Sequence, residues 1–425
     1  MDITFLVPIL KVLAALGLML IFLRLKLGIG LSILLGSLGM ALFFGHGPVQ
    51  WTRMGLASLI DTQLVLLLVI IDLIMVLSQL LESTGQSQRL MKQLGIALRW
   101  EKLRLAFFPA LIGLLPMPGG AVFSAPMVKN ATEHTAPSGE RLALINYWFR
   151  HVWEMIWPLY PGIILAASLS GLSLFRLISF TWPSTLILLA LGWFFYLTRL
   201  PAPKIETNHD SALRFDLRET FRQGSPLIIA VLGTLGLEVL IWVLQLPLPS
   251  ETGFIAALVL AVGTCLLQNR ETVKGWGRLF VKAHVLSMLG TLAAIYVFKG
   301  VLDQGGVVQE LSQGAGSRAT LLAITCSLPF LVGCISGISM AFVGSTFPLI
   351  HGIMAQLSIE ATIPYVVLAL FSGFAGVMAS PLHICFVLTC EYFQSSLIRT
   401  WLKLLIPTGL FLACGVVYSF LLMAG

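Results

Sequence analysis

The sequence predicts an all-α polytopic membrane protein made of two inverted repeats, each with five transmembrane helices and one re-entrant hairpin. Of its 425 residues, 57% are hydrophobic and only 11% are charged, and the mean hydropathy is +0.94. Soluble domains carry about 25% charged residues. Apolar runs as long as a membrane-crossing helix recur along the chain, and one polar stretch, residues 200–223, divides it near the middle.

Ten apolar segments are predicted to cross the bilayer, in chain order: 5–23, 29–45, 55–81, 142–170, 178–199, 224–246, 252–268, 279–299, 362–392 and 404–424. Two further apolar stretches, 105–127 and 319–350, are interrupted by Gly, Pro and Ser in their middle. A helix that faces lipid does not tolerate such breaks, because its backbone groups would lose their partners. These two stretches are therefore predicted to be re-entrant hairpins.

The Lys and Arg residues support this topology. When the sides of the loops are assigned by counting crossings, 20 of the 26 basic residues fall on one side, which the positive-inside rule makes cytoplasmic. The asymmetry requires both hairpins to return to the side from which they entered. We expect a prokaryotic inner (plasma) membrane protein with both termini periplasmic, and the basic residues then need no nucleic acid partner.

The two halves also correspond in residues. At a displacement of 220, Pro109, Leu111, Gly113 and Ala121 coincide with the same residue types at Pro329, Leu331, Gly333 and Ala341. At a displacement of 223, Trp157-Pro158-Leu159-Tyr160 aligns with Ser380-Pro381-Leu382-His383. The helices at 142–170 and 362–392 are thus predicted to be broken at matched places. The domains are a first repeat (1–199), a cytoplasmic linker (200–223) and a second repeat (224–425), opposite in orientation because each half has an odd number of crossings.

This order of spans, hairpins and Pro-broken helices resembles the ion transporter superfamily of secondary carriers. More narrowly, Leu115-Pro116-Met117-Pro118-Gly119-Gly120 together with Trp157-Pro158-Leu159-Tyr160-Pro161-Gly162 resembles the membrane family known as domain of unknown function 401. The wider resemblance implies a scaffold domain, a moving transport domain, an elevator motion and a homodimer. The hairpin tips lack the Ser-Asn-Thr signatures of the symporters, so the resemblance implies no particular substrate.

The hairpin tips are candidate binding segments. An interrupted helix presents free N–H groups that favour anions and free carbonyls that can coordinate sodium. The predicted substrate-binding residues at the tips are Pro118, Gly119, Gly120, Ser336, Gly337 and Ser339. A bound sodium ion at these tips is compatible with the same pattern. The alternative is that the glycines only form tight turns.

A second group of candidates lies in the two broken helices. Arg150 is expected near the middle of the bilayer, on the helix face that also carries Asn146 and Glu154. We expect Arg150 and Asn146 to bind an anionic substrate, and His151 or Glu154 to take the coupling ion. Alternatively, Arg150 and Glu154 form a purely structural ion pair.

Two weaker candidates flank the second helix break. Ser380 and His383 lie on either side of Pro381, where a polar side chain would face the same cavity. They complete the predicted substrate-binding set, and a histidine satisfied within the core is the alternative for His383.

The predicted function is ion-coupled secondary transport of a small, anionic organic solute, driven by protons or sodium. No motif of a hydrolase or nucleotide-binding loop occurs, so neither an enzyme nor a cofactor is expected. The six cysteines lie in apolar segments without an evident metal-ligand spacing and are expected to be buried small hydrophobes. The alternatives are a sodium/proton or other cation-proton antiporter, with Glu154 and Asp72 carrying ions, and a membrane assembly factor.

Overall fold

The computed structural model describes residues 6–98, 100–115, 120–132, 137–198, 200, 215–269, 283–310 and 317–424, and within these ranges its regular secondary structure is all helical. The helices of the first half are α1 (Leu6–Arg24), α2 (Ile29–Phe43), α3 (Pro48–Leu59), α4 (Thr62–Ser83), α5 (Gln86–Ala97), α6 (Glu101–Gly113), α7 (Ala121–Asn130), α8 (Gly139–Arg150), α9 (Pro161–Ser170), α10 (Leu174–Thr181), α11 (Pro183–Gly192) and the π-helical turn η2 (Trp193–Leu197). Those of the second half are α12 (Leu217–Val243), α13 (Ser250–Gln268), α14 (Ala283–Gln304), α16 (Arg318–Ser336), α17 (Ser339–Gln356), α18 (Thr362–Ala379), α19 (Ile384–Tyr392) and α20 (Leu397–Ala424).

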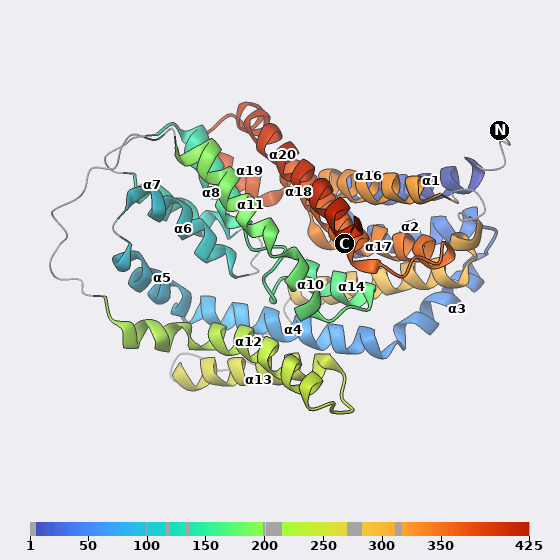
Figure 1. Ribbon diagram of the computed structural model, residues 1–425, viewed down its shortest axis with the longest axis horizontal. Helices are drawn as coiled ribbons and strands as arrows, with labels where there is room; N and C mark the ends of the chain where they lie inside the picture. Colours follow the sequence, from blue (N-terminus) through green and yellow to red (C-terminus); the bar gives the residue numbers. More distant parts are fainter. Residues whose placement is uncertain are drawn as a thin grey trace.

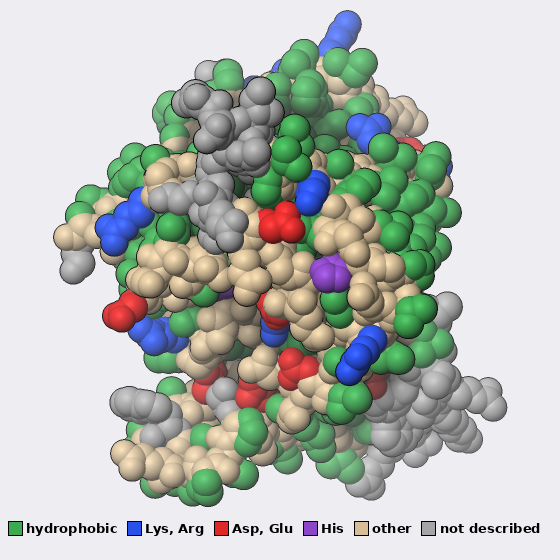
Figure 2. Space-filling model, turned by 90° about the vertical axis from the view of Figure 1, so that its right-hand side faces the viewer, with side chains coloured by type: hydrophobic (Ala, Val, Ile, Leu, Met, Phe, Trp, Pro, Cys, Tyr) green, Lys and Arg blue, Asp and Glu red, His purple; other side chains and the backbone are tan. Residues whose placement is uncertain are grey.

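Eight helices or near-continuous helix runs in the described residues are long and apolar enough to cross a membrane, and α2 and α9 are shorter apolar helices. Side chains such as Leu232, Leu260 and Leu421 are large, apolar and exposed, as expected of surfaces that face lipid. At the end of the molecule seen in Figure 2, charged side chains of both signs lie amid polar surface, and hydrophobic ones lie along much of the edge. This distribution fits a membrane protein whose end meets water.

The predicted spans correspond to helices with boundaries that differ by up to seven residues, and two short helices, α3 and α5, were not predicted as separate elements. α3 precedes α4 as its own helix, because Asp61 caps α4 and accepts a hydrogen bond from the Gln63 backbone N–H at 2.9 Å. α5 is amphipathic, with Leu90 and Met91 buried and charged residues outside. The end of the predicted linker, from Leu217 onward, is already part of α12, and residues 201–214 lie outside the described residues.

Both predicted helix breaks are present. α8 and α9 are separated by a non-helical stretch of turns from His151 to Tyr160, and α18 and α19 by Ser380–His383. Pro161 and Pro381 lack a backbone N–H, so the α-helical hydrogen-bond ladder cannot run through these stretches unbroken. α8 has 12 residues and α9 has 10, and each is shorter than the roughly 20 residues that a crossing requires.

The two predicted hairpins correspond to two packed helix pairs, α6 with α7 and α16 with α17. Gly337 joins the second pair in a left-handed conformation at φ +66°, which glycine adopts without strain. Pro118 and Gly119, at the predicted tip of the first pair, lie outside the described residues. α16 alone is long enough to cross a bilayer, so the re-entrant path of 319–350 stays a prediction, as does the inverted orientation of the halves.

The helices are arranged around the broken pair. Figure 1 shows α12 and α13 side by side along one edge of the molecule next to α4, with α6, α7 and α8 grouped at one end and α16, α17, α1 and α2 toward the other. α16 packs on α18, and α17 packs on α9 and α14. Helices from both halves of the chain therefore enclose the two breaks.

Small residues allow α16 and α18 to approach closely. A Cβ placed on Gly376 would lie 2.1 Å from the Phe330 carbonyl oxygen, and one on Gly333 would lie 2.3 Å from the Gly373 oxygen. In lipid no hydrophobic driving force brings helices together, and close packing at small residues such as glycine stabilises their association instead. The two helices consequently touch through their backbones.

Gly376→Ala is therefore expected to lower the thermal unfolding midpoint of the purified protein. Overpacking of this kind costs about 1–3 kcal/mol, and here the obstacle is a backbone that cannot swing away. Gly409→Ala in α20 is the matched control, since nothing lies within 4 Å of its added Cβ. Equal midpoints for the two variants would show that α16 and α18 separate easily.

Candidate functional site

A cavity of about 410 Å³ lies where the two helix breaks meet. Its lining comes from the two breaks, from the turn between α16 and α17, and from α2, α4 and α14. The polar or titratable side chains of the lining are Arg150, His151, Glu154, Tyr160, Ser287, Thr291, Ser339, His383 and Cys385. A cavity of this volume accommodates a small organic molecule.

Three helix N-termini point their first turns toward this cavity. Pro161 and Gly162 begin α9, Ser339 and Met340 begin α17, and Ile384 and Cys385 begin α19, and all six residues line the cavity. None of the three helices has a side-chain cap at its N-terminus. Their first N–H groups and partial positive charge therefore favour an anion in the cavity.

Arg150 contributes the positive side chain of the cavity. It is the last residue of α8, where the negative end of the helix dipole favours a cation, and it is only 3% exposed. A Cβ on Gly120 would lie 2.6 Å from Arg150 Nη2, so the guanidinium lies against the backbone of the α6–α7 connection. The absence of a side chain at Gly120 leaves the room that the guanidinium occupies.

His151 and His383 face each other across the two breaks. Their Nε2 atoms are 3.0 Å apart. His151 Nδ1 lies 2.6 Å from the Tyr147 carbonyl oxygen, and His383 Nδ1 lies 2.6 Å from the Gly337 carbonyl oxygen. A carbonyl oxygen only accepts, so each Nδ1 carries a proton and donates it.

This arrangement leaves the two Nε2 atoms as the positions where the pair can share a proton. If both rings were neutral, each Nε2 would present a bare lone pair to the other at 3.0 Å, which is repulsive. One proton removes this repulsion, because an imidazolium ring donates an N–H···N hydrogen bond to the Nε2 atom of the other ring. Both histidines are buried, so a proton shared by the pair would lie away from bulk water.

Glu154 is the acidic residue of the cavity lining. The Ser339 hydroxyl donates a hydrogen bond of 2.9 Å to Glu154 Oε2, and Glu154 Oε1 lies 3.7 Å from His151 Nε2. Ser339 in turn lies against Gly162, where an added Cβ would be 2.9 Å from Ser339 Cβ. The carboxylate thus connects the first break to the turn of the second helix pair.

Six of the predicted site residues line this one cavity: Arg150, His151, Glu154, Gly337, Ser339 and His383. Gly120 adjoins it through its contact with the Arg150 guanidinium. The roles predicted for these residues stay predictions.

Three other predicted residues, Asn146, Ser336 and Ser380, form hydrogen bonds outside the cavity. Asn146 donates hydrogen bonds to the Ala121 carbonyl at 3.0 Å and to the Thr389 hydroxyl at 3.2 Å, which ties α8 to α7 and α19. The hydroxyl of Ser336 accepts from the Ile338 N–H at 3.3 Å, and that of Ser380 accepts from the Leu382 N–H at the same distance. None of these three side chains lines the cavity.

Sequence reasoning missed four polar residues of the cavity lining: Tyr160, Ser287, Thr291 and Cys385. The Tyr160 hydroxyl donates to the carbonyl oxygen of Gly113, at the end of α6. Cys385 is buried, and its sulfur lies within 4.8 Å of a ring nitrogen of both His151 and His383. The spacing His383-x-Cys385 was a signal for this cluster, but His151 joins it only through the fold.

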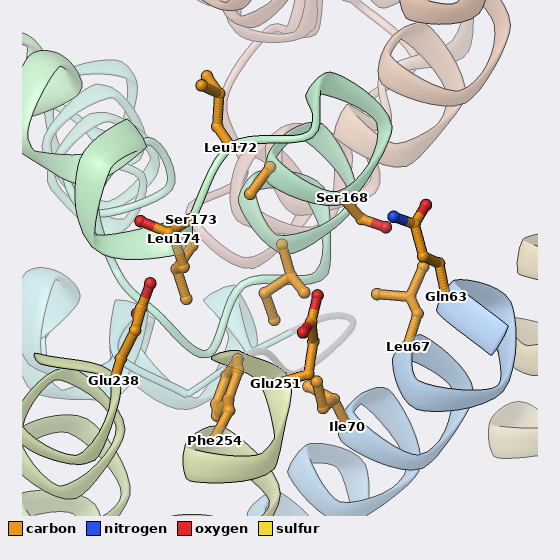
Figure 3. A pocket seen from close by; sticks show the side chains of 12 residues that line it. Gln63, Leu67, Ile70, Ser168, Leu172, Ser173, Leu174, Glu238, Glu251 and Phe254 are labelled. Carbon is orange, nitrogen blue, oxygen red and sulfur yellow. The ribbon is translucent and has the colours of Figure 1, made fainter. Parts of the chain in front are cut away.

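A second, smaller pocket of about 50 Å³ lies between α4, α9, α12 and α13 (Figure 3). The carboxylates of Glu238 and Glu251 both point into it, with Phe254 between their helices and Gln63 at its side. A space of this size holds one or a few water molecules rather than an organic solute. We therefore take the larger cavity as the candidate functional site.

The fold and this site define a class: a helical membrane protein with a polar, titratable cavity enclosed between two broken helices. The chain belongs to the family described as Protein of unknown function (DUF401), whose model matches residues 7–422. This match bears out the narrower of the two resemblances, and the wider one, to the ion transporter superfamily, stays a prediction. No curated protein matches the sequence.

Proposed function

We propose that the protein is a secondary active transporter that carries a small organic anion across the prokaryotic inner membrane together with protons. The observation that carries the proposal is the 410 Å³ cavity, onto which three uncapped helix N-termini and Arg150 converge. Helix N-termini and a guanidinium are the groups that proteins use to bind carboxylates and phosphates. A purely structural Arg150–Glu154 pair would not need a cavity of this volume beside it.

The charges of the cavity suggest how the solute and the proton are coupled. With the histidine pair deprotonated, Arg150 and Glu154 balance each other. With one proton on the pair, the cavity gains one positive charge and attracts an anion more strongly. Binding linkage is reciprocal, so the bound anion raises the affinity for the proton by the same factor. This cooperativity favours symport of the two over movement of either one alone.

For the motion, we propose alternating access by two inverted repeats. The two helix pairs, α6–α7 and α16–α17, and the two breaks after them supply matched elements in each half, which is the plan of many secondary transporters. An elevator movement in a homodimer is what the superfamily resemblance implies. The excess of Lys and Arg in alternate loops supports periplasmic termini.

The proposal is tested in two steps with the purified, detergent-solubilised protein. A thermal-shift screen against organic anions, with and without sodium, identifies ligands, because a ligand that binds the folded form raises its apparent stability. A stabilising anion is then tested in proteoliposomes with an imposed proton or sodium gradient. We expect uptake that follows the proton gradient.

Two outcomes would overturn this function. Sodium-dependent proton efflux without any organic solute would instead show a cation-proton antiporter. Asp72, which that alternative needs, does not line the cavity. An Arg150→Ala variant with every flux unchanged would favour an assembly role.

A further inference from the structure

The histidine pair has a third neighbour that the transport mechanism does not use. Cys385 lies in the first turn of α19, and its sulfur and the two imidazoles place three potential ligand atoms within 4.8 Å of one another. All three residues are buried, and all three line the cavity. Two imidazoles and a thiolate are a typical ligand set for zinc and related divalent metals.

The orientation of the rings matches a metal site. Each Nδ1–H donates a hydrogen bond to a backbone carbonyl, and this orients the two Nε2 atoms toward each other. Metal-binding histidines commonly donate their other ring N–H in this way, which sets the tautomer and the ring orientation. The pair therefore has the outer hydrogen bonds of a ligand pair already in place.

The distance between the two ring nitrogens needs only a small adjustment. Two nitrogens bound to one tetrahedral Zn²⁺, each about 2.05 Å from it, are roughly 3.3 Å apart. The two Nε2 atoms are now 3.0 Å apart, so they would separate by a few tenths of an ångström. Glu154 Oε1 is 3.7 Å from His151 Nε2 but is not among the three ligand atoms that lie within 4.8 Å of one another, so its carboxylate would have to move toward the metal to act as a fourth ligand.

We propose that His151 Nε2, His383 Nε2 and Cys385 Sγ bind one thiophilic divalent cation of the Zn²⁺ class, with Glu154 closing the coordination sphere. On binding, the proton shared by the imidazoles and the proton of the thiol leave to solvent, and the metal takes their place. The metal and the proton therefore compete for the same Nε2 atoms. The inference does not depend on transport, because binding is measured on the resting protein.

The pH dependence follows from the groups around the metal. Two imidazoles and one thiol must be free of the competing protons, and Glu154 must be ionised, so affinity falls as the pH falls. The Arg150 guanidinium and the Tyr147 and Tyr160 hydroxyls are the other titratable groups beside the cluster. None of these three is a zinc ligand in the proposed site.

The test uses Co²⁺ and Zn²⁺ alone with the purified full-length protein. We expect one Zn²⁺ per chain by equilibrium dialysis, a rise in the thermal unfolding midpoint that a chelator reverses, and a thiolate-to-cobalt charge-transfer absorption with Co²⁺. Cys385→Ser should abolish the absorption and weaken Zn²⁺ binding by at least about 100-fold, since loss of even an outer partner costs 10–100-fold. Cys390→Ser, a buried cysteine farther along α19, is the matched control.

Two results would overturn the site. Wild-type protein that takes up Co²⁺ without the charge-transfer absorption would exclude the thiolate, and this measurement needs no variant to fold. A Cys385→Ser protein that binds Zn²⁺ as tightly as the wild type would do the same. Failure of the organic-anion screen would leave both readouts unaffected, so the two proposals can fail separately.

Discussion

Arg150→Ala is expected to weaken binding of the organic anion by about 100-fold or more, which corresponds to roughly 2.8 kcal/mol. The guanidinium lines the cavity and is buried, so its hydrogen bonds to a bound anion would be charge-assisted and poorly screened. Helix N-termini alone contribute about 0.3–1 kcal/mol each at exposed sites and up to about 2 kcal/mol when partly buried, and they do not replace it. The measurement is the dissociation constant of the anion found in the thermal-shift screen.

Gly120→Ala tests the same guanidinium by displacing it rather than removing it. Its Cβ would lie 2.6 Å and 2.8 Å from the two terminal nitrogens of Arg150, so the guanidinium must move while its charge remains. We expect a smaller loss of affinity than for Arg150→Ala, and none for Gly409→Ala. If Arg150→Ala only lowers the unfolding midpoint and leaves the anion affinity intact, Arg150 has a structural role and the anion site lies elsewhere.

His383→Gln is expected to lower proton-driven accumulation of the solute by about 100-fold. Exchange of labelled for unlabelled solute should continue. A glutamine amide can still donate to the Gly337 carbonyl, which His383 Nδ1 does now. It cannot hold a proton between two imidazoles, so the charge that couples the proton to the anion is lost. Uptake and exchange are both measured in proteoliposomes, the first with an imposed pH gradient.

His46→Gln is the matched control for this prediction. Its Nε2 also contacts a backbone carbonyl, that of Gly305 at 3.0 Å, but it lies outside the cavity. It should keep both accumulation and exchange. A His383→Gln protein that still accumulates solute against a gradient would show that the histidine pair does not carry the coupling proton.

Much of the helical arrangement was predictable from the sequence because the bilayer leaves few choices. Apolar length predicts each crossing, and Pro158 and Pro381 mark the breaks since neither can donate to a helical ladder. α3 and α5 were not predicted, because short helices with mixed faces give no strong hydropathy signal. Gly337 was predicted as a substrate-binding residue of the hairpin tip, and the tight turn that it forms was the stated alternative.

The composition of the site was predictable in part. Arg150 and Glu154 share a helical spacing and are costly in lipid, so the sequence alone points to them. His383 and Cys385 are 232 and 234 positions after His151 in the chain, and only the tertiary fold brings these side chains together. Asn146 was assigned to the substrate because spacing cannot distinguish a side chain that faces a cavity from one that bonds a neighbouring helix.

The backbone contact between α16 and α18 limits how the cavity can open. Where a main-chain oxygen fills the space of a missing side chain, as at Gly333 and Gly376, neither helix can slide without clashing, so the two move together as a rigid body. Against α14, by contrast, α17 is held by side chains, with Ile295 packed at Gly344. A side chain can adopt another staggered rotamer, whereas a main-chain contact cannot, so we expect this boundary to shear more readily than that between α16 and α18. If the cavity opens as the proposed transport requires, we expect the opening on the α14 side, with α18 moving together with the wall that carries the second break.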